Sequence, residues 1–262
     1  MNMAPASIGR LSETPHAEDS VRYMLLTGAS RGIGHATVKL FQEHNWKVFT
    51  VSRQAFSDDC KWRAARESHI QADLADLNSV EKIADEVRRR LPDGKLHALV
   101  NNAGISPKGE DRMRLGVLKS DIRTWSTVLN VNLVSNALLA QALFQELARA
   151  KGAIVNVTSI AGFKVHPFAG TAYAVSKAAL FALTREMAHE FGSEGIRVNA
   201  IAPGEIDTSI LSPGTEEIVN KEIPLHRLGN PREVAETIHF LCGPAASYIN
   251  GAEIHINGGQ HV

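Results

Sequence analysis

The octet TGASRGIG, residues 27–34, directly follows a short apolar run. That run, residues 21–26, is rich in strand-forming side chains, and residues 33–44 carry apolar side chains at helical spacing. The octet is therefore predicted to turn a strand into a helix. Its G-x-x-x-G-x-G spacing differs from the common G-x-G-x-x-G dinucleotide fingerprint. It also lacks the Gly-Lys-Ser/Thr of a Walker loop, which argues against a nucleotide triphosphatase.

The three glycines of the octet suit an anion site. Glycine adopts positive φ and leaves room where another group must approach closely. Gly28, Gly32 and Gly34 could thus serve a tight turn, access for a diphosphate, and close packing of the new helix on the sheet. A helix that begins near Ile33 would point its free N–H groups at that diphosphate. A glycine-rich turn that binds no ligand is the alternative.

Composition favours one soluble globular domain. The 262 residues are 44% hydrophobic and 21% charged, which is ordinary for such a domain. We expect residues 1–20, which are polar and small, to form a flexible N-terminal extension, and residues 21–262 to form the domain. Lys plus Arg and Asp plus Glu both number 28, so no long-range field would draw the chain to nucleic acid or to an anionic membrane.

Cysteine usage and hydropathy indicate a cytoplasmic protein. Cys60 and Cys242 are the two cysteines, they lie far apart, and no Cys/His spacing resembles a metal site, so we expect neither a disulfide framework nor a metal. The first twenty residues lack the apolar core of a secretory signal. No later stretch reaches the roughly 18 apolar residues that a membrane helix needs.

Strand and helix patterns alternate along the whole chain. After the octet, further strands are predicted at 46–52, 95–102, 153–159, 196–203 and 252–257, and helices at 77–91, 121–149, 171–191 and 231–241. An Asn or Ser cap is expected to open the helix at 77–91. Near-continuous apolar strands between amphipathic helices predict an α/β fold, a doubly wound parallel sheet covered on both faces. In such sheets, ligands bind at the carboxyl ends of the strands.

Five short motifs together resemble one known family. They are TGASRGIG, NNAG at 101–104, Ser159 at a strand end, YAVSK at 173–177 and PGEIDT at 203–208. In this order, over about residues 22–260, they resemble the short-chain dehydrogenase/reductases. The resemblance implies one Rossmann-type domain with a seven-stranded parallel sheet, a nicotinamide cofactor, and a dimer or tetramer.

Tyr173 and Lys177 are suited to proton transfer. Four residues apart on a helix, they share one face. A phenol has a pKa of about 10, and an ammonium group a few ångströms away lowers it towards the working pH, where acid–base catalysis is most effective. Taken alone, such a pair is more often structural than catalytic.

The resemblance assigns roles to four catalytic residues. Tyr173 would give its proton to the carbonyl oxygen, while Lys177 lowers the tyrosine pKa and holds the nicotinamide ribose. Ser159 would hydrogen-bond the same oxygen. Asn132, in NVNL, would anchor a water-mediated proton path to Lys177. Singly, Ser159 and Asn132 could be a turn residue and a polar helix residue; their joint placement favours catalysis.

The resemblance also implies a cofactor site. Asn101 would support the sheet, Asp73 would contact the adenine amino group or remain a solvated carboxylate, and the segment from Pro203 would hold the carboxamide. The expected cofactor-binding residues are Gly28, Ser30, Arg31, Gly32, Ile33, Gly34, Ser52, Arg53, Asp73, Leu74, Asn102, Ala103, Gly104, Tyr173, Lys177, Pro203, Gly204, Ile206 and Thr208.

The end of the second strand favours NADP(H) over NAD(H). A carboxylate there would bind the ribose 2′-hydroxyl of NAD, whereas guanidinium groups would pair with a 2′-phosphate. TVSRQ, residues 50–54, has Ser52 and Arg53 and no acidic residue, and Arg31 can reach the same place. The alternative is that both arginines are solvated surface residues.

The substrate is expected to be a small carbonyl or secondary alcohol. Residues 227–259 resemble the 3-oxoacyl carrier-protein reductases, but Glu194 stands where those reductases tend to carry a basic residue facing the carrier. Arg149 and Lys151 could still supply positive charge nearby. Sugar, polyol or other small-alcohol dehydrogenases remain alternatives, and a non-catalytic NADP(H) sensor is an alternative of another class.

Loops and helix faces give two further expectations. Residues 105–124 form a long connection, and 205–223 resemble a lid over the substrate. The loop residues Phe163, Val165, His166 and Phe168 either line the pocket or pack within their own loop. The helices around 126–149 and 171–191 are apolar on more than one face, which predicts a homotetramer, with a dimer as second choice.

Overall fold

Seven parallel strands form a single sheet in the computed structural model of the chain, which describes residues 21–55, 67–109, 113–208 and 214–262. Their order across the sheet is β3-β2-β1-β4-β5-β6-β7. The strands are β1 (Arg22–Thr27), β2 (Trp46–Ser52), β3 (His69–Gln71), β4 (Ala98–Asn101), β5 (Ala153–Val157), β6 (Arg197–Pro203) and β7 (Glu253–Ile256). The predicted doubly wound parallel sheet is confirmed. The expected extension 1–20 and Cys60 lie outside the described residues.

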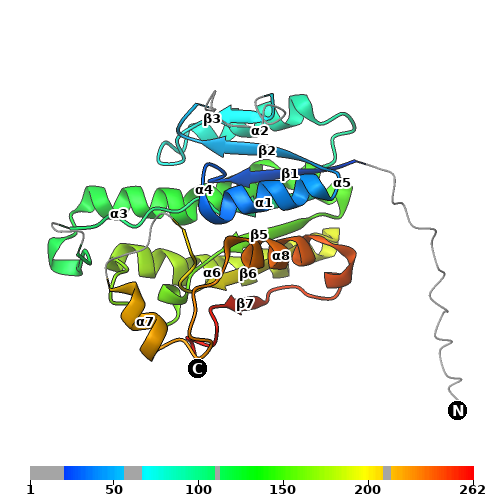
Figure 1. Ribbon diagram of the computed structural model, residues 1–262. Helices are drawn as coiled ribbons and strands as arrows, with labels where there is room; N and C mark the ends of the chain where they lie inside the picture. Colours follow the sequence, from blue (N-terminus) through cyan, green and yellow to red (C-terminus); the bar gives the residue numbers. More distant parts are fainter. Residues whose placement is uncertain (1–20, 56–66, 110–112, 209–213) are drawn as a thin grey trace, which may run out of the picture.

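Helices cover both faces of this sheet (Figure 1). One layer consists of α1 (Gly32–Glu43) and α8 (Pro231–Cys242), which pack against each other. The other contains α2 (Ser79–Arg90), α4 (Ser135–Ala142), α5 (Phe144–Ala150) and α6 (Thr171–Phe191). The shorter elements are α3 (Ile122–Leu129), α7 (Thr215–Lys221), the 3-10 turns η3 (Val117–Lys119), η5 (Ile160–Gly162), η6 (Gly192–Glu194) and η7 (Pro244–Ala246), and the π-helical turn η4 (Asn130–Val134).

Strands β1, β2, β4, β5 and β6 each contribute to two separate apolar cores. In β1, Leu25 joins the core under α2, α4 and α6, whereas Met24 and Leu26 join the core under α1 and α8. All three side chains are fully buried. Because helices cover both faces of the sheet, side chains on both sides of a strand are apolar. The strands therefore appear in the sequence as continuous apolar runs.

Helix starts follow different rules in α8 and α2. At α8, Asn230 and Glu233 form a capping box, as the pattern NPRE allows. At α2, the expected cap is wrong in detail, because Asn78 makes no side-chain cap. Instead, Asp76 Oδ1 accepts hydrogen bonds from the backbone and side chain of Asn78, at 3.1 and 3.0 Å.

The helix predicted over 121–149 is broken in the structure. It divides into α3, the π-helical turn η4, α4 and α5. The break at η4 coincides with Asn132, whose side chain hydrogen-bonds both the N–H and the C=O of Ile105. An extra residue in the helical turn directs this polar side chain inwards, as is common for π-turns at functional sites.

Two elements are absent from the periodicity-based prediction. Strand β3, with the sequence HIQ, is only three residues long. Helix α7 lies within the expected lid segment. Within the described parts of the chain, no single helix is long and apolar enough to span a membrane, although the bent pair Ile122–Ala142 and Phe144–Ala150 together passes a test of length and composition.

Candidate active site

The four predicted catalytic residues lie together at the carboxyl end of the sheet. Ser159 follows β5, Tyr173 and Lys177 share one face of α6, and Asn132 sits in η4. The Ser159 side chain lies close enough to Tyr173 to lower the pKa of its phenol, and Lys177 Nζ lies 5.7 Å from the Tyr173 ring centroid. Elements far apart in the sequence thus converge on one point.

Asn132 fastens the loop after β4 to helix α6. Its Oδ1 accepts a hydrogen bond from Ile105 N at 2.9 Å, and its Nδ2 donates to Ile105 O and to Ser176 Oγ, both at 3.0 Å. Ser176 Oγ in turn donates to Tyr173 O at 2.7 Å. Asn132 and Ser176 are fully buried. Asn132 therefore holds the helix that carries Tyr173 against the rest of the site.

Lys177 is a buried cation. It is 3% exposed, and its Nζ donates to Val157 O at 2.6 Å. Burial lowers the pKa of Lys177 from 10.5 to about 8. The ammonium group is consequently charged at neutral pH and begins to lose its proton only slightly above it.

The Tyr173 pKa differs from the expected direction. Burial raises it, the hydrogen bond with Ser159 lowers it, and the negative charge of Glu205 raises it further, with a net increase from 10.0. The expected lowering by Lys177 is wrong for this arrangement, because the ammonium group points to a backbone carbonyl and the phenol is desolvated. Tyr173 accordingly holds its proton at neutral pH.

A chain of buried polar side chains runs beneath these residues. Asn101 Nδ2 donates to Asn156 Oδ1, and Asn156 Nδ2 donates to Thr184 Oγ1, each at 2.8 Å. Thr184 Oγ1 donates to Leu180 O at 2.8 Å. The chain links β4, β5 and α6, so the predicted supporting role of Asn101 has a physical basis. Asn156 and Thr184 were not singled out from the sequence.

The glycine loop is locked to the end of β4. Thr27 Oγ1 accepts hydrogen bonds from the backbone N–H groups of Asn102 and Ala103, at 3.1 and 3.0 Å. Asn102 Nδ2 donates to Thr27 O and Gly28 O, at 3.0 and 2.9 Å. Gly28 has a φ of +72°, and a Cβ there would lie 2.8 Å from Ala103 Cα, so only glycine fits.

A second close approach, between Gly104 and Lys177, lies at the other end of the space that begins at the glycine loop. A Cβ on Gly104 would lie 3.3 Å from Lys177 Nζ and 3.7 Å from Asn132 Oδ1. Gly104 thus leaves open the space beside the lysine. Gly28 and Gly104 thus keep side chains out of the space between the glycine loop and Lys177.

The other predicted cofactor residues differ in exposure. Ser30, Arg31, Arg53 and Asp73 are exposed, Gly32, Ile33 and Ser52 are partly exposed, and Gly34 and Leu74 are buried. Ser52 Oγ donates to Gln54 O at 2.9 Å, and Asp73 Oδ1 accepts from Ala75 N at 3.0 Å. Among the described residues, no ion pair involves Arg31 or Arg53.

The segment after β6, residues 203–208, packs against the glycine loop. Pro203 ends β6, Ile206 is buried, and the backbone pairs with Gly229. A Cβ on Gly32 would lie 3.1 Å from Thr208 Cγ2, so this segment reaches the glycine loop. A Cβ on Gly204 would lie 2.6 Å from Asn257 Cβ, which fixes this residue as glycine too.

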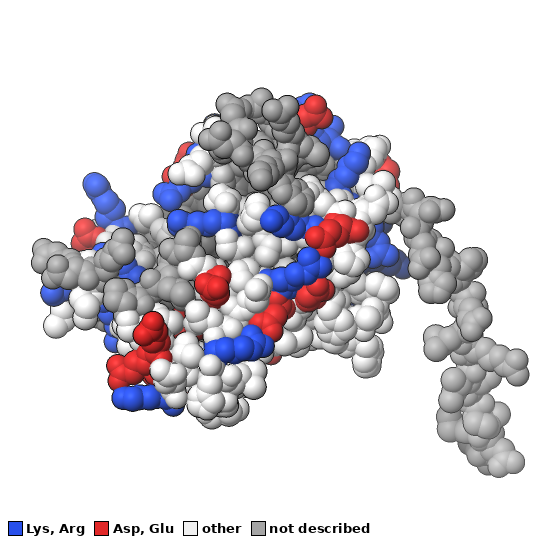
Figure 2. Space-filling model, viewed as in Figure 1, with Lys and Arg blue, Asp and Glu red and all other residues white. Residues whose placement is uncertain are grey.

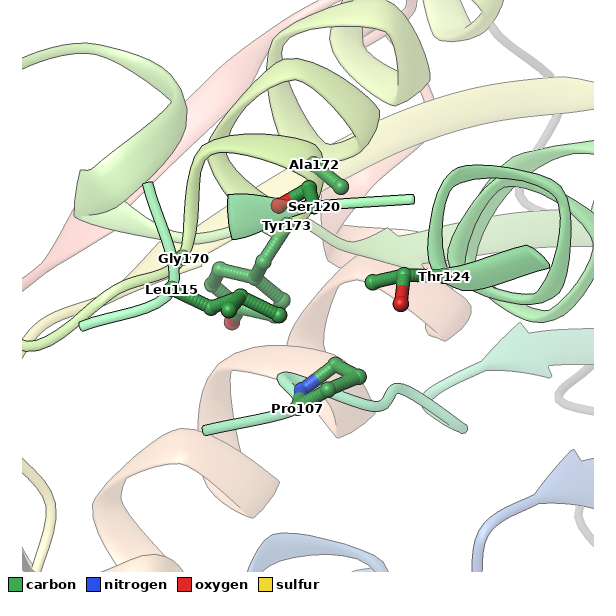
Figure 3. A pocket seen from close by; sticks show the side chains of 7 residues that line it. All are labelled: Pro107, Leu115, Ser120, Thr124, Gly170, Ala172 and Tyr173. Atoms are coloured by element: carbon green, nitrogen blue, oxygen red, sulfur yellow. The ribbon is translucent and has the colours of Figure 1, made fainter. Parts of the chain in front are cut away.

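A small pocket borders the ring of Tyr173 (Figure 3). Its walls come from the connection 105–124 and from the start of α6, and it is lined by Pro107, Leu115, Ser120, Thr124, Gly170, Ala172 and Tyr173. The connection 105–124 therefore forms one wall of the pocket at Tyr173. Among the described residues, no group of three or more His, Cys, Asp or Glu side chains is placed to hold a metal ion.

The four residues predicted to line the pocket or to pack within their own loop differ in exposure and contacts. Phe163 and Val165 are 63% and 76% exposed, and the Phe163 ring packs edge-on against His255. Phe168 lies against Gly214. His166 is buried and bonded to Glu205. That last pair was not linked from the sequence, although each partner stands in a segment that was named.

Charge is mixed on the face of the molecule shown in Figure 2, where basic and acidic side chains are interspersed. At the turn before β6, Glu194 is exposed, as is Lys151, whose side chain lies near Gly195. Arg149 Nη1 is paired with Glu146 Oε1 at 3.2 Å. The expected positive charge beside Glu194 is thus reduced to one lysine.

The chain is similar to a family model and to several known proteins. A family model described as enoyl-(acyl carrier protein) reductase matches residues 28–261. Protein FixR of Bradyrhizobium diazoefficiens is 57% identical over 242 residues, 92% of this chain and 87% of its own length. The 3-oxoacyl-[acyl-carrier-protein] reductase FabG of Chlamydia muridarum is 33% identical over 246 residues, 90% and 96% of the two chains.

One solved structure combines high identity with a cofactor. It is a Brucella ovis oxidoreductase of the short-chain dehydrogenase/reductase family in complex with a partially ordered NAD. It is 54% identical, has a TM-score of 0.79, and covers 91% of this chain and all of its own.

Proposed function

Since the chain belongs to the short-chain dehydrogenase/reductase family, we propose that it is an NADP(H)-dependent oxidoreductase that interconverts a carbonyl compound and a secondary alcohol. The observation that carries the proposal is the convergence of Tyr173 and the buried ammonium group of Lys177 on one face of α6, with Ser159 close enough to lower the pKa of the phenol.

The side chains present can perform the proton transfer. Tyr173 holds its proton at neutral pH, because burial raises its pKa, and so can donate it to a carbonyl oxygen. Ser159 is placed to hydrogen-bond the same oxygen and to stabilise negative charge on it. Lys177 supplies positive charge to the site, and Asn132 keeps α6 in register. When bound, a reduced nicotinamide would supply the hydride.

The cradle between the two glycine motifs fits such a cofactor. Gly28 and Gly104 leave the clearance, Asn102 and Ala103 fix the backbone, and Lys177 would hold the nicotinamide ribose. Helix α1 begins at Gly32 with no side chain capping it, so its first N–H groups can face a diphosphate. Thr208 and Ile206 would contact the nicotinamide end.

NADP(H) is proposed over NAD(H) because of two arginines. Arg31 and Arg53 are exposed, and residues 52–55 after β2 contain no carboxylate. Guanidinium groups pair well with a phosphate, which only NADP(H) offers there. Because the Brucella ovis relative is in complex with a partially ordered NAD, NADPH and NADH are compared directly in the test of this preference.

The cofactor proposal predicts a reversal in Arg53→Asp. Losing one charged hydrogen-bonding partner costs about 10- to 100-fold in affinity, and the new carboxylate suits the 2′-hydroxyl of NAD. The ratio of kcat/KM for NADPH to that for NADH should therefore fall by at least tenfold. Arg89→Asp, an exposed arginine on α2, makes the same charge change and should leave the ratio unaltered. A wild-type preference for NADH would refute NADP(H) specificity.

Two substrate classes are proposed. The likeness to a FabG supports a 3-oxoacyl thioester, whereas Glu194 and the pairing of Arg149 leave little positive charge for an acidic carrier protein. A sugar, polyol or other small alcohol is the second class.

NADPH oxidation against ketones, acetoacetyl thioesters and sugars tests the reaction, with Tyr173→Phe as the control. We expect this variant to lose about 100- to 10,000-fold in kcat/KM, because the proton donor is gone. Equal slow rates in both proteins would instead favour a non-catalytic NADP(H) sensor.

A homotetramer is proposed for the assembly, and a dimer second. Helix α6 exposes Val175, and β7 lies at a sheet edge. Light scattering that gives a monomer at micromolar concentration would overturn this.

A further inference from the structure

The connection 105–124 folds back on itself, and the chemistry proposed above gives this feature no role. Lys108 and Arg114 pair as an antiparallel β-bridge between the stretches 105–109 and 113–116, and a backbone hydrogen bond of 3.0 Å joins the same two stretches. These stretches therefore lie side by side as two arms. We call the two arms the hairpin.

Two cationic side chains, one from each arm, fasten the hairpin to the segment before α6. The Lys108 ammonium group donates to Phe168 O, and Arg114 Nε donates to Ala169 O at 2.9 Å. Lys108 is partly buried and Ala169 is buried, so water competes little for these bonds. Hydrogen bonds from charged donors are stronger than neutral ones. Both arms are therefore held to this segment.

The backbone of the hairpin comes closest at the start of α6. Leu115 O accepts a hydrogen bond from Thr171 N at 3.0 Å. A Cβ on Gly170 would lie 3.3 Å from Leu115 O and 3.4 Å from Pro107 O, one oxygen from each arm. Both arms thus lie against the residues that lead into the turn of α6 that carries Tyr173.

This contact narrows the space beside Tyr173. Pro107 and Leu115, one from each arm, line the pocket at the Tyr173 ring together with Thr124 of α3 (Figure 3). The empty space of the pocket, counted together with its open side, is about 170 Å³. Because one water molecule takes about 30 Å³ of liquid water, this space equals that of about six waters and holds a group of only a few heavy atoms.

Resting on the proposed function, we propose that the hairpin, fastened by Lys108 and Arg114, determines specificity by admitting only carbonyl compounds in which one of the two groups on the carbonyl carbon is smaller than a butyl chain. The pocket borders the Tyr173 ring, so one of the two groups beside a carbonyl that Tyr173 protonates would occupy it. A larger group would have to displace Leu115, and such overpacking is costly.

This limit narrows both proposed substrate classes. In a 3-oxoacyl thioester the thioester side is already large, so the acyl side must be short, as in an acetoacetyl group. In a sugar or polyol the carbonyl would have to lie next to the end of the carbon chain. Ketones with two long chains are excluded.

A purely structural role is the competing explanation, in which the hairpin only completes the fold around α6. Leu115→Ala separates the two roles, because it enlarges the pocket and keeps the backbone hydrogen bond of Leu115 O. Arg114→Gln instead weakens the fastening and leaves the lining side chains unchanged. Leu118→Ala is the matched control, since it makes the same change at a fully exposed leucine of the same connection.

The test compares two isomeric ketones, nonan-2-one and nonan-5-one, in NADPH oxidation. The first carries a methyl group on the carbonyl carbon, whereas the second carries a butyl chain on each side. We expect wild type and Leu118→Ala to prefer nonan-2-one by about 10- to 100-fold in kcat/KM, the range for overpacking. In Leu115→Ala this ratio should fall by at least about fivefold, because nonan-5-one gains activity. Arg114→Gln should lower the ratio by a smaller factor.

Other results overturn the inference. It fails if wild type shows no preference, or if Leu118→Ala changes the ratio as much as Leu115→Ala does. It also fails if Leu115→Ala lowers kcat/KM equally for both ketones, which is the result of a purely structural role.

A binding measurement keeps this inference separate from the proposed function. If wild type reduces no carbonyl in the wider substrate panel, the proposed function itself fails. Calorimetric binding of nonan-2-ol against nonan-5-ol then decides the inference, as it does if wild type reduces neither nonanone. Nonan-2-ol should bind wild type more tightly, and Leu115→Ala should remove most of the difference. Equal binding of the two alcohols to wild type, or no binding of either, refutes the inference.

Discussion

The buried polar chain under the candidate active site and the ion pairs on the outer surface of α1 and α8 have contacts of similar length. They are expected to contribute very differently to the stability of the fold. Asn101, Asn156 and Thr184 are fully buried and joined by two hydrogen bonds of 2.8 Å. Arg232 forms ion pairs with Glu43 at 2.8 Å and Glu236 at 3.2 Å, with all three side chains about half exposed. A contact of the same length therefore stabilises the fold only where water cannot replace it.

Burial also explains why the proposed catalytic residues lie in the inner region. Lys177 and Asn132 hold fixed positions because every polar partner is inside the protein, and this precision is what proton transfer needs. The exposed rim, with Arg31 and Arg53, can change its charge pattern at little cost to the fold. The two regions thus separate the proposed chemistry from the proposed choice of cofactor.

The largest effect is expected at the centre of the buried chain. Asn156→Ala leaves Asn101 Nδ2 without an acceptor and removes the donor to Thr184 Oγ1, besides creating a cavity. We predict a loss of about 3 to 5 kcal/mol in the free energy of unfolding, measured by urea denaturation. Thr184→Val, which keeps the shape and removes one hydroxyl, should cost less. A loss below that of Thr184→Val would show that the chain contributes no more than its packing.

A gain in stability is expected at Lys177. Because burial lowers its pKa from 10.5 to about 8, the folded protein carries a cost below pH 8 that the unfolded chain does not. Lys177→Met removes this cost and should raise the free energy of unfolding by up to about 3 kcal/mol at pH 7, while abolishing turnover.

The pH dependence separates this effect from simple repacking. Between pH 8 and 10.5, the unfolded chain binds more protons than the folded one, so the stability of the wild type rises relative to Lys177→Met. The difference between the two proteins should vanish near pH 10.5. A difference independent of pH would show that buried charge is not its cause.

The sequence indicates most of the fold because its signals are local. Apolar runs and helical spacing place six of the strands and the long α6, and the glycine octet marks the strand-to-helix turn. Strand β3 escapes, because three residues carry no periodicity. The helix break at Asn132 is not predicted either, because its side chain hydrogen-bonds the C=O and N–H of Ile105, which is far away in the sequence.

In the candidate site, too, local signals predict some features and the folded arrangement reveals the others. Motif spacing names Tyr173 and Lys177, but the direction of the Tyr173 pKa shift depends on burial and on Glu205, which only the folded arrangement reveals. Asn156, a polar residue inside the apolar run AIVNV, was a usable signal for the buried chain. The pairing of His166 with Glu205 had no local signal, since their 39-residue separation is closed only by the sheet.

The smallest effect is expected on the outer surface, where the comparison began. Arg232→Gln breaks the ion pairs with Glu43 and Glu236, which link α8 to α1 and bridge one turn of α8. Because these groups are hydrated before and after the change, and salt screens them, the melting temperature should shift by no more than the reproducibility of the measurement at 0.15 M salt. A shift as large as that of Thr184→Val would mean that surface charge contributes to this fold as strongly as its buried polar chain.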